Sequence, residues 1–373
     1  MTDRLHILHL TAGSDAGGLS RYIFDLSMAM RSAGHRVEVA GERGAWHWLF
    51  ERSPLPWIDL PLKGGPVALM ASATRLRKRF RREGMPDVLH CHYRRPTLVA
   101  RLLRLLGVRV PILYTLHLSD LSLSWGARLL SDFGDHTHVA STESLHWMLE
   151  QARVPRQRVT LIPHGVPLEQ FPVTTAETRR AARDRFGLLE DDRVGVYVGR
   201  LDQRHPKNCH WLLDIAAAWG ERERPRLRLL LAGEGPDLPE LQRRILRDGL
   251  SERVHLLGHQ PPLPVYQAAD LLLLPSGREG FSLVCAEALA TGLPVLRTRT
   301  AGTTETVVEG VTGESTPIDR SAFVRAALGL LADPQRLAAM RPAAAAHARA
   351  HLGFDRQFAD TVALYRRLAA SPP

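Results

Sequence analysis

Two carboxylates in the second half of the chain are spaced so that they could meet at one site. Glu279 lies in the polar loop 276–280, directly after the apolar run Leu271–Leu274. A short apolar run of this kind is typical of a buried parallel strand. Glu287 falls on the second turn of the helix that should follow the loop, with Ser282 as the expected N-cap.

The helix should bring Glu287 back to the loop, because helical side chains lean toward the helix N-terminus. Gly280, Phe281 and Ser282 would present unpaired backbone N–H groups there. Positive helix-end dipoles beside two carboxylates suit a ligand that is anionic at one end and rich in hydroxyls at the other. A sugar nucleotide is such a ligand. Two surface acids on an ordinary helix are the alternative interpretation.

Two cations follow an earlier apolar run, residues 194–198, which predicts another buried strand. Arg200 comes directly after this run, and Lys207 precedes a predicted helix over 209–219. Two cations beside a helix N-terminus could hold a diphosphate. Surface cations without a ligand are the alternative.

The N-terminal half contains a glycine pair and a histidine at comparable places. Gly17 and Gly18 stand between a predicted strand, 5–10, and a predicted helix, 19–32. Paired glycines before a helix let the backbone approach a phosphate closely, although a tight turn without a ligand would look the same. His117 ends the predicted strand 110–116, at the edge where open α/β sheets bind ligands.

Strands and helices alternate along the whole chain and predict an α/β fold. The strand 5–10, the helix 19–32 and a strand at 37–40 form a right-handed βαβ unit that opens a doubly wound sheet. The pattern starts afresh at residue 194. We therefore expect two facing Rossmann-like domains with a cleft between them, each a parallel sheet with helices on both faces. Further strands are predicted near 87–92, 110–116, 139–143, 159–162, 227–231, 254–257, 271–274 and 295–296.

The length of 373 residues also favours two domains. We expect the first over 1–170 and the second over 171–354, joined by a polar, proline-containing connection. No apolar run approaches the roughly 18 residues that span a bilayer, and the N-terminus does not resemble a signal peptide. Cys91, Cys209 and Cys285 are far apart in the sequence, which argues against zinc and disulfides and predicts a cytoplasmic protein.

Most of the positive charge lies in the first half. Residues 1–170 contain 22 Lys+Arg and 15 Asp+Glu, so they carry +7 of the net +10. A basic half could face anionic lipid, nucleic acid or an anionic acceptor. The predicted helix 69–83 has one apolar face and is otherwise basic. We favour a core-packed helix with a solvated outer face over one that lies on a membrane.

The frame Ser-Gly-Arg-Glu-Gly-Phe-Ser-Leu around Glu279, with Glu287 and a later Gly-x-Pro-Val, closely resembles the signature of the retaining glycosyltransferases of family four, which have the GT-B fold. Gly-Arg-Leu at 199–201 and Lys207 resemble a second element of that family, although Asn208 replaces its usual glycine. The resemblance extends over nearly the whole chain.

The resemblance implies a role for each candidate residue. Glu279 and His117 would act at the reacting sugar, and Glu287 would bind the ribose. The last helix, 355–370, would return to the first domain. The other implied contacts are the donor diphosphate for Arg200, Lys207, Gly17 and Gly18; the donor sugar for Glu279, Gly280, Phe281 and Ser282; the base for Gly258, His259 and Gln260; and the acceptor for His92, Tyr93 and Arg94.

The expected activity is transfer of a hexose-type sugar from a nucleotide-diphosphate sugar, with UDP preferred over GDP. The acceptor would be a glycan, a lipid-linked molecule or a small molecule, and no metal or other cofactor is expected. Such an enzyme could sit on the anionic inner face of the membrane, and no specific nucleic acid is expected as a partner. Two alternatives remain open: another GT-B enzyme, such as a sugar-nucleotide epimerase or a phosphorylase, and a non-catalytic basic protein that binds membranes or nucleic acid.

Overall fold

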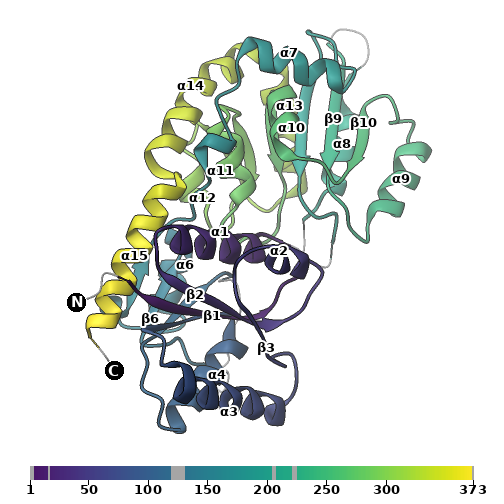
Figure 1. The fold of residues 1–373 in the computed structure, drawn as a ribbon. Helices are drawn as coiled ribbons and strands as arrows, with labels where there is room; N and C mark the ends of the chain where they lie inside the picture. Colours follow the sequence, from purple (N-terminus) through teal and green to yellow (C-terminus); the bar gives the residue numbers. More distant parts are fainter. Residues whose placement is uncertain (1–3, 16, 119–130, 204–206, 221–224, 372–373) are drawn as a thin grey trace. The chain divides into compact units, whose positions relative to one another are not determined.

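The computed structural model describes residues 4–15, 17–118, 131–203, 207–220 and 225–371. The chain forms two compact units (Figure 1). Met1–Ile162 and Gln357–Pro373 form the first, and Pro163–Arg356 forms the second. The division therefore falls before the predicted boundary at residue 170, and the chain returns to the first unit after residue 356.

The first unit is built on a seven-stranded sheet with the order β3-β2-β1-β4-β5-β6-β7. All its described strand pairs are parallel. The carboxyl ends of the strands therefore share one edge of the sheet. The strands are β1 His6–Gly13, β2 Arg36–Glu42, β3 Trp57–Asp59, β4 Val88–His92, β5 Ile112–Leu116, β6 His136–Val139 and β7 Val159–Leu161.

Helices cover both faces of this sheet, because alternate strand residues are apolar on both sides. One core joins Leu8 to α3 (Pro66–Glu83) and α4 (Arg94–Leu105). The other joins Ile7 to α1 (Gly18–Ser32) and the end of α15 (Phe354–Ala370). In Figure 1, α1 and α3 lie on opposite sides of the strands. The remaining helices are α2 His47–Glu51 and α6 Thr142–Glu150.

One strand of this sheet begins earlier than predicted. The sequence suggested a strand from Val139, but β6 starts at His136 and ends at Val139. All four residues of β6 are buried, including His136, Thr137 and His138. Because three of its four buried residues are polar, this strand does not appear in the sequence as an apolar run.

The second unit contains a six-stranded parallel sheet with the order β10-β9-β8-β11-β12-β13. The strand order reverses between β8 and β11, and open sheets bind ligands at the carboxyl side of such a switch point. The strands are β8 Arg193–Val198, β9 Leu227–Ala232, β10 Val254–Gly258, β11 Leu271–Leu274, β12 Val295–Thr298 and β13 Gly313–Thr316.

One continuous apolar core joins this sheet to its helices. The helix α11 (Leu283–Ala290) begins as predicted, since Ser282 Oγ accepts a hydrogen bond of 3.3 Å from the Cys285 amide. None of the described helices is both long enough and apolar enough to cross a membrane. The other helices are α7 Ala176–Arg185, α8 His210–Ala218, α9 Leu238–Arg247, α10 Pro262–Ala268, α12 Thr303–Thr306, α13 Arg320–Ala332 and α14 Pro334–His351.

Candidate functional site

The two most informative predicted residues of the second unit form an ion pair. Lys207 Nζ lies 2.6 Å from Glu279 Oε1, although 72 residues separate them in the sequence. Their side chains are 24% and 13% exposed, respectively. A short N–H···O contact between opposite charges is a strong, charge-assisted hydrogen bond. The pair lies where the loops after β8 and β11 meet, because these strands are neighbours in the sheet.

Asn208 holds the loop of Lys207 in place. It adopts φ 50°, in the left-handed region that favours glycine and that asparagine also tolerates. Its Nδ2 donates a 2.9 Å hydrogen bond to the Pro275 carbonyl at the end of β11. Asparagine can therefore stand where the resembled family has glycine, and its side chain adds a link between the two loops.

Arg200 is anchored at one side and exposed at the other. Its Nε donates a 3.0 Å hydrogen bond to Asp202, whose side chain is buried, while the arginine side chain is 52% exposed. Tyr197 Oη donates to the Arg200 carbonyl at 2.8 Å. These contacts fix the base of a guanidinium that still reaches solvent.

Glycines bring the loops after β8 and β9 into direct backbone contact. Gly233 has φ 152°, and a Cβ atom there would lie 1.8 Å from the Gly199 carbonyl oxygen. A Cβ atom at Gly235 would lie 2.0 Å from the Leu201 carbonyl oxygen. No side chain fits at either position, so both glycines are required for the turn that carries Arg200.

Glu287 lies on α11 as predicted and has a partner from another helix. Tyr266 Oη, from α10, donates a 2.7 Å hydrogen bond to Glu287 Oε2. Tyr266 is fully buried, and burial together with the nearby carboxylate raises its pKa well above the ordinary value. The phenol therefore stays protonated and orients the carboxylate. No pattern in the sequence pointed to Tyr266.

The segment between the two glutamates is tightly packed. Gly280 and Ser282 are buried, and the Phe281 ring lies 5.5 Å from that of His164, edge to face. Gly302 approaches this segment so closely that a Cβ atom would lie 3.1 Å from Phe281 Cα. The Ser282 hydroxyl already caps α11, so its backbone amide is the group that the predicted sugar contact would use.

Arg297 supports this edge of the sheet and was not predicted. It is fully buried at β12, and its guanidinium donates to the carbonyls of Ala301 and Gly302 and to the hydroxyls of Thr300 and Thr306 at 2.8–3.0 Å. Among the described residues, no carboxylate forms an ion pair with it. Its charge therefore adds positive potential behind the loop that packs on Phe281.

The predicted base contacts lie after β10. Gly258 adopts φ 64°, and its carbonyl accepts a 2.8 Å hydrogen bond from the Gly233 amide. His259 is exposed. The Gln260 side chain already bonds to Arg185 Nη2 at 3.1 Å and to the Leu257 carbonyl at 3.2 Å.

In the first unit, the glycine pair opens the N-terminus of α1. Gly17 occupies the N-cap with φ 146°, and no side chain caps the helix. Gly17 and Gly18 are exposed, and a Cβ atom at Gly17 would meet nothing within 4 Å. The N-terminus of this 15-residue helix is therefore exposed at its two glycines, which suits an anion.

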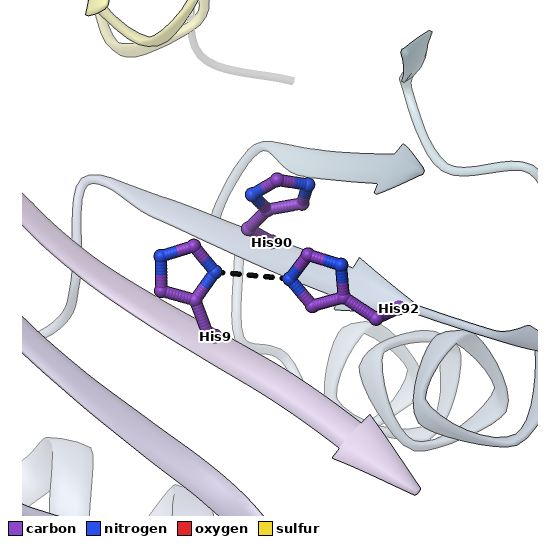
Figure 2. Close-up of side chains that lie close together, drawn as sticks. All are labelled: His9, His90 and His92. Atoms are coloured by element: carbon purple, nitrogen blue, oxygen red, sulfur yellow. Dashed lines mark hydrogen bonds between the residues drawn. The ribbon is translucent and has the colours of Figure 1, made fainter. Parts of the chain in front are cut away.

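His117 is joined to two buried histidines. His117 Nε2 lies 3.1 Å from His92 Nδ1, and His92 Nε2 lies 3.0 Å from His9 Nδ1. Figure 2 shows the second of these bonds, with His90 beside it. Burial lowers the pKa of both His117 and His9 to about 3, so these imidazoles are neutral at pH 7.

A parallel chain of hydrogen bonds fixes the tautomer of His90. His138 Nε2 lies 2.8 Å from the Ile162 carbonyl and must donate, so its Nδ1 accepts from Thr115 Oγ1 at 3.0 Å. The Thr115 oxygen then accepts from His90 Nε2 at 2.6 Å. His90 Nδ1 in turn accepts from Tyr365 Oη at 2.6 Å, which ties α15 to the sheet.

The predicted acceptor residues have different surroundings. His92 has no exposed surface, so it cannot touch an acceptor directly from this position. Tyr93 is 39% exposed, and its ring lies 5.8 Å from that of His117. Its φ of 76° is uncommon for a bulky residue, and such strain often occurs at functional sites. Arg94 follows at the start of α4, with a buried Nη2 that has no hydrogen-bond partner in the described part of the chain.

Comparison with known proteins decides the family. Residues 16–170 match the family described as Glycosyltransferase Family 4, and residues 192–333 match Glycosyl transferases group 1. The D-inositol 3-phosphate glycosyltransferase of Nocardia farcinica is 30% identical over 378 residues, which cover 90% of this chain and 81% of the relative. The chain belongs to the family 4 glycosyltransferases.

Solved structures show that this glycosyltransferase has the GT-B fold. Anabaena HepE, solved with UDP, has a TM-score of 0.84 at 21% identity and covers 97% of this chain and 100% of its own. A glycosyltransferase of Rickettsia africae has a TM-score of 0.85 at 14% identity, with coverages of 98% and 99%. At these identities the likeness concerns the fold alone.

Within each unit of the glycosyltransferase, the predicted residues gather at the carboxyl edge of the sheet. In the second unit these are Arg200, Lys207, Gly258, Glu279 and the segment 280–282, with Glu287 on the helix that follows. In the first unit, Gly17, His117 and Tyr93 lie after β1, β5 and β4. Tyr266, Arg297 and His9 are the supporting residues that the sequence did not reveal.

Proposed function

We propose that this glycosyltransferase transfers a hexose from a UDP-hexose to a hydroxyl group of an acceptor, with retention of the anomeric configuration and without a metal ion. The observation that carries the proposal is the ion pair of Lys207 and Glu279 at the switch point of the second sheet. It places a cation suited to a diphosphate beside a carboxylate suited to a sugar.

The leaving diphosphate would be stabilised by fixed positive groups. Arg200 and Lys207 supply two charges, and the N-termini of α8 and α11 add backbone dipoles. By the family resemblance, Gly17 and Gly18 at the N-terminus of α1 would also contact the diphosphate. Such groups can replace a divalent cation, because they stabilise the negative charge that develops on the diphosphate as the sugar–phosphate bond breaks.

Most of the groups that would hold the sugar and the ribose lie in the second unit, and His117 lies in the first. Glu279 and the amides of Gly280, Phe281 and Ser282 would bind the donor hexose. Glu287, oriented by Tyr266, would bind the ribose hydroxyls. His117 would contact the hexose as a neutral imidazole, since burial lowers its pKa to about 3.

Retention follows from the family resemblance and not from a nucleophile in the chain. The acceptor oxygen would form its bond to the anomeric carbon on the face from which the diphosphate departs. The bond between that carbon and the phosphate oxygen breaks, and the acceptor proton passes to the leaving diphosphate. Glu279 would stabilise positive charge at the anomeric carbon.

Names of relatives suggest the first substrates to test. HepE has been solved with UDP-glucose, and eight curated relatives are named D-inositol 3-phosphate glycosyltransferases. An anionic acceptor such as inositol 3-phosphate would suit the guanidinium of Arg94, which is half-buried at the start of α4. Tyr93 would contact the acceptor beside His117.

A lipid-linked or glycan acceptor is the second candidate, and the exposed face of α3 favours it. Val67 and Met70 are 84% and 43% exposed on the first turns of this helix. Lys78, Arg81 and Arg82 are exposed on the later turns. An apolar and basic helix face can lie on an anionic membrane surface, and vesicle flotation with and without anionic lipid would test this.

Calorimetry with UDP and GDP in magnesium-free buffer with EDTA tests the donor site. We expect UDP to bind in the micromolar range, more tightly than GDP, and Lys207→Met to weaken it. If neither nucleotide binds, the proposed diphosphate site at Arg200 and Lys207 is refuted. A sugar-nucleotide epimerase would consume the donor without an acceptor, and a phosphorylase would need inorganic phosphate, so assays with and without these compounds separate the alternatives.

A further inference from the structure

Three potential metal ligands from two different helix starts meet in the second unit. Cys209 and His210 begin α8, and Asp237 precedes α9. One donor atom from each of them lies within 4.8 Å of the other two. His210 Nε2 and Asp237 Oδ2 are 3.9 Å apart. A thiolate, an imidazole and a carboxylate are each common zinc ligands in proteins.

A second group with metal-like spacing, His9, His90 and His92, does not fit an ion. Figure 2 shows the three side chains, and their nearest nitrogens also lie within 4.8 Å of one another. Both nitrogens of His90 are already hydrogen-bonded, one to Thr115 and one to Tyr365. A nitrogen engaged in this way has no lone pair for a metal unless a buried hydrogen bond is broken.

The group around Cys209 differs because its donor atoms are not engaged. His210 Nε2 and Asp237 Oδ2 are both buried, and neither has a hydrogen-bond partner among the described residues. Buried polar atoms without partners are rare and costly. Asp237 also occupies the N-cap of α9 without capping it by its side chain. Its carboxylate is directed elsewhere, toward His210.

Cys209 is suited to become a thiolate ligand. Its side chain is fully buried at the start of α8, where the dipole of the helix N-terminus favours a negative charge. A bound metal would displace the thiol proton and take the thiolate as its ligand.

We propose that Cys209 Sγ, His210 Nε2 and Asp237 bind one zinc ion, with a water molecule as the fourth ligand. The ion would tie the N-terminus of α8 to that of α9. It would thereby hold the segment that carries Lys207 and Asn208, which directly precede Cys209. Its role would be structural, so it does not supply the charge that stabilises the diphosphate, and the proposal does not depend on the proposed reaction.

Cobalt is the probe that tests the thiolate directly. The full-length protein is treated with a chelator under reducing conditions and titrated with Co²⁺, which gives a thiolate-to-metal absorption band in the near ultraviolet when cysteine binds it. We expect one equivalent to bind with this band, and Zn²⁺ to displace it. Cys209→Ser should abolish the band, whereas Cys285→Ser, which changes another buried cysteine, should retain it.

Each outcome bears on the proposal. His210→Gln should weaken Co²⁺ binding at least tenfold and shift the band, because one ligand is lost and the thiolate remains. Absence of the band in the folded wild-type protein, or its persistence in Cys209→Ser, would overturn the proposal. If Cys209→Ser does not fold, the His210→Gln titration decides. UDP binding is measured separately by calorimetry on the zinc-loaded protein. The zinc proposal can therefore fail while the donor-site proposal stands, and the reverse.

Discussion

Replacing Glu279 by glutamine and Lys207 by methionine should change the affinity for UDP in opposite directions. In the structure, the Lys207 ammonium is held by Glu279 at 2.6 Å. An incoming diphosphate must therefore replace a carboxylate that already occupies the cation. Glu279→Gln keeps the shape of the side chain and removes its charge. UDP should then bind more tightly than to the wild type.

The effect of Lys207→Met can be estimated from the contact that is lost. A hydrogen bond to a charged group contributes about 1.5–3 kcal/mol. Since about 1.4 kcal/mol corresponds to a factor of ten, UDP should bind roughly 10- to 100-fold more weakly. Both variants should lose turnover, because Glu279 is proposed to act on the sugar and Lys207 on the leaving group.

Calorimetry with UDP, together with steady-state turnover, separates these effects. Arg336→Met is the matched control, since it removes a cation paired with Glu314 at the outside of the same unit. We expect the control to bind UDP as the wild type does. If Glu279→Gln weakens UDP binding as much as Lys207→Met does, the carboxylate and the diphosphate do not compete for Lys207, and the reasoning is wrong.

Three further predictions concern the supporting structure. Burial lowers the pKa of His9 and His117 to about 3, so only the unfolded chain takes up these protons near pH 6.5. The free energy of unfolding of the first unit should thus be constant above about pH 7 and fall by about 1.4 kcal/mol per pH unit for each histidine below about pH 6.5. Hydrogen exchange of β1 amides, expressed as protection factors that correct for the slower intrinsic exchange at low pH, measures this; equal protection factors at about pH 7.5 and about pH 5.5 would contradict it. Tyr365→Phe leaves the His90 nitrogen without its donor and should cost about 1–3 kcal/mol, seen as faster exchange in α15, whereas unchanged exchange would argue against the tautomer chain. Asn208→Gly keeps the left-handed backbone and should retain UDP binding better than Asn208→Ala, so equal affinities of the two variants would show that the backbone angle is unimportant.

Local patterns predicted the parts of the fold that depend on local physics. The apolar run before Glu279 and the hydroxyl of Ser282 fixed the strand, the loop and the helix start in the expected order. The helical spacing placed Glu287 on the second turn of α11. These features depend on residues within about one turn of helix or one strand, so a single sequence contains them.

The partners of these residues could not be predicted, because they come from distant parts of the chain. The contact of Lys207 with Glu279 requires β8 to lie beside β11, which the sequence order does not reveal. The bonds of His92 to His9 and His117 likewise need the order β1-β4-β5. Cys209, His210 and Asp237 come from two helix starts, and their sequence spacing matches no known metal motif.

The stereochemistry of the product tests the central claim most directly. The protein is incubated with UDP-glucose, the α-linked donor, and inositol 3-phosphate in magnesium-free buffer, and the product is examined by proton NMR. We predict release of UDP and a new glucoside with the small anomeric coupling of an α-linkage. If this donor is not used, the other UDP-hexoses and lipid-linked acceptors are assayed in the same way. A β-linked product, or turnover that requires added magnesium with every substrate pair, would contradict a metal-independent retaining transfer.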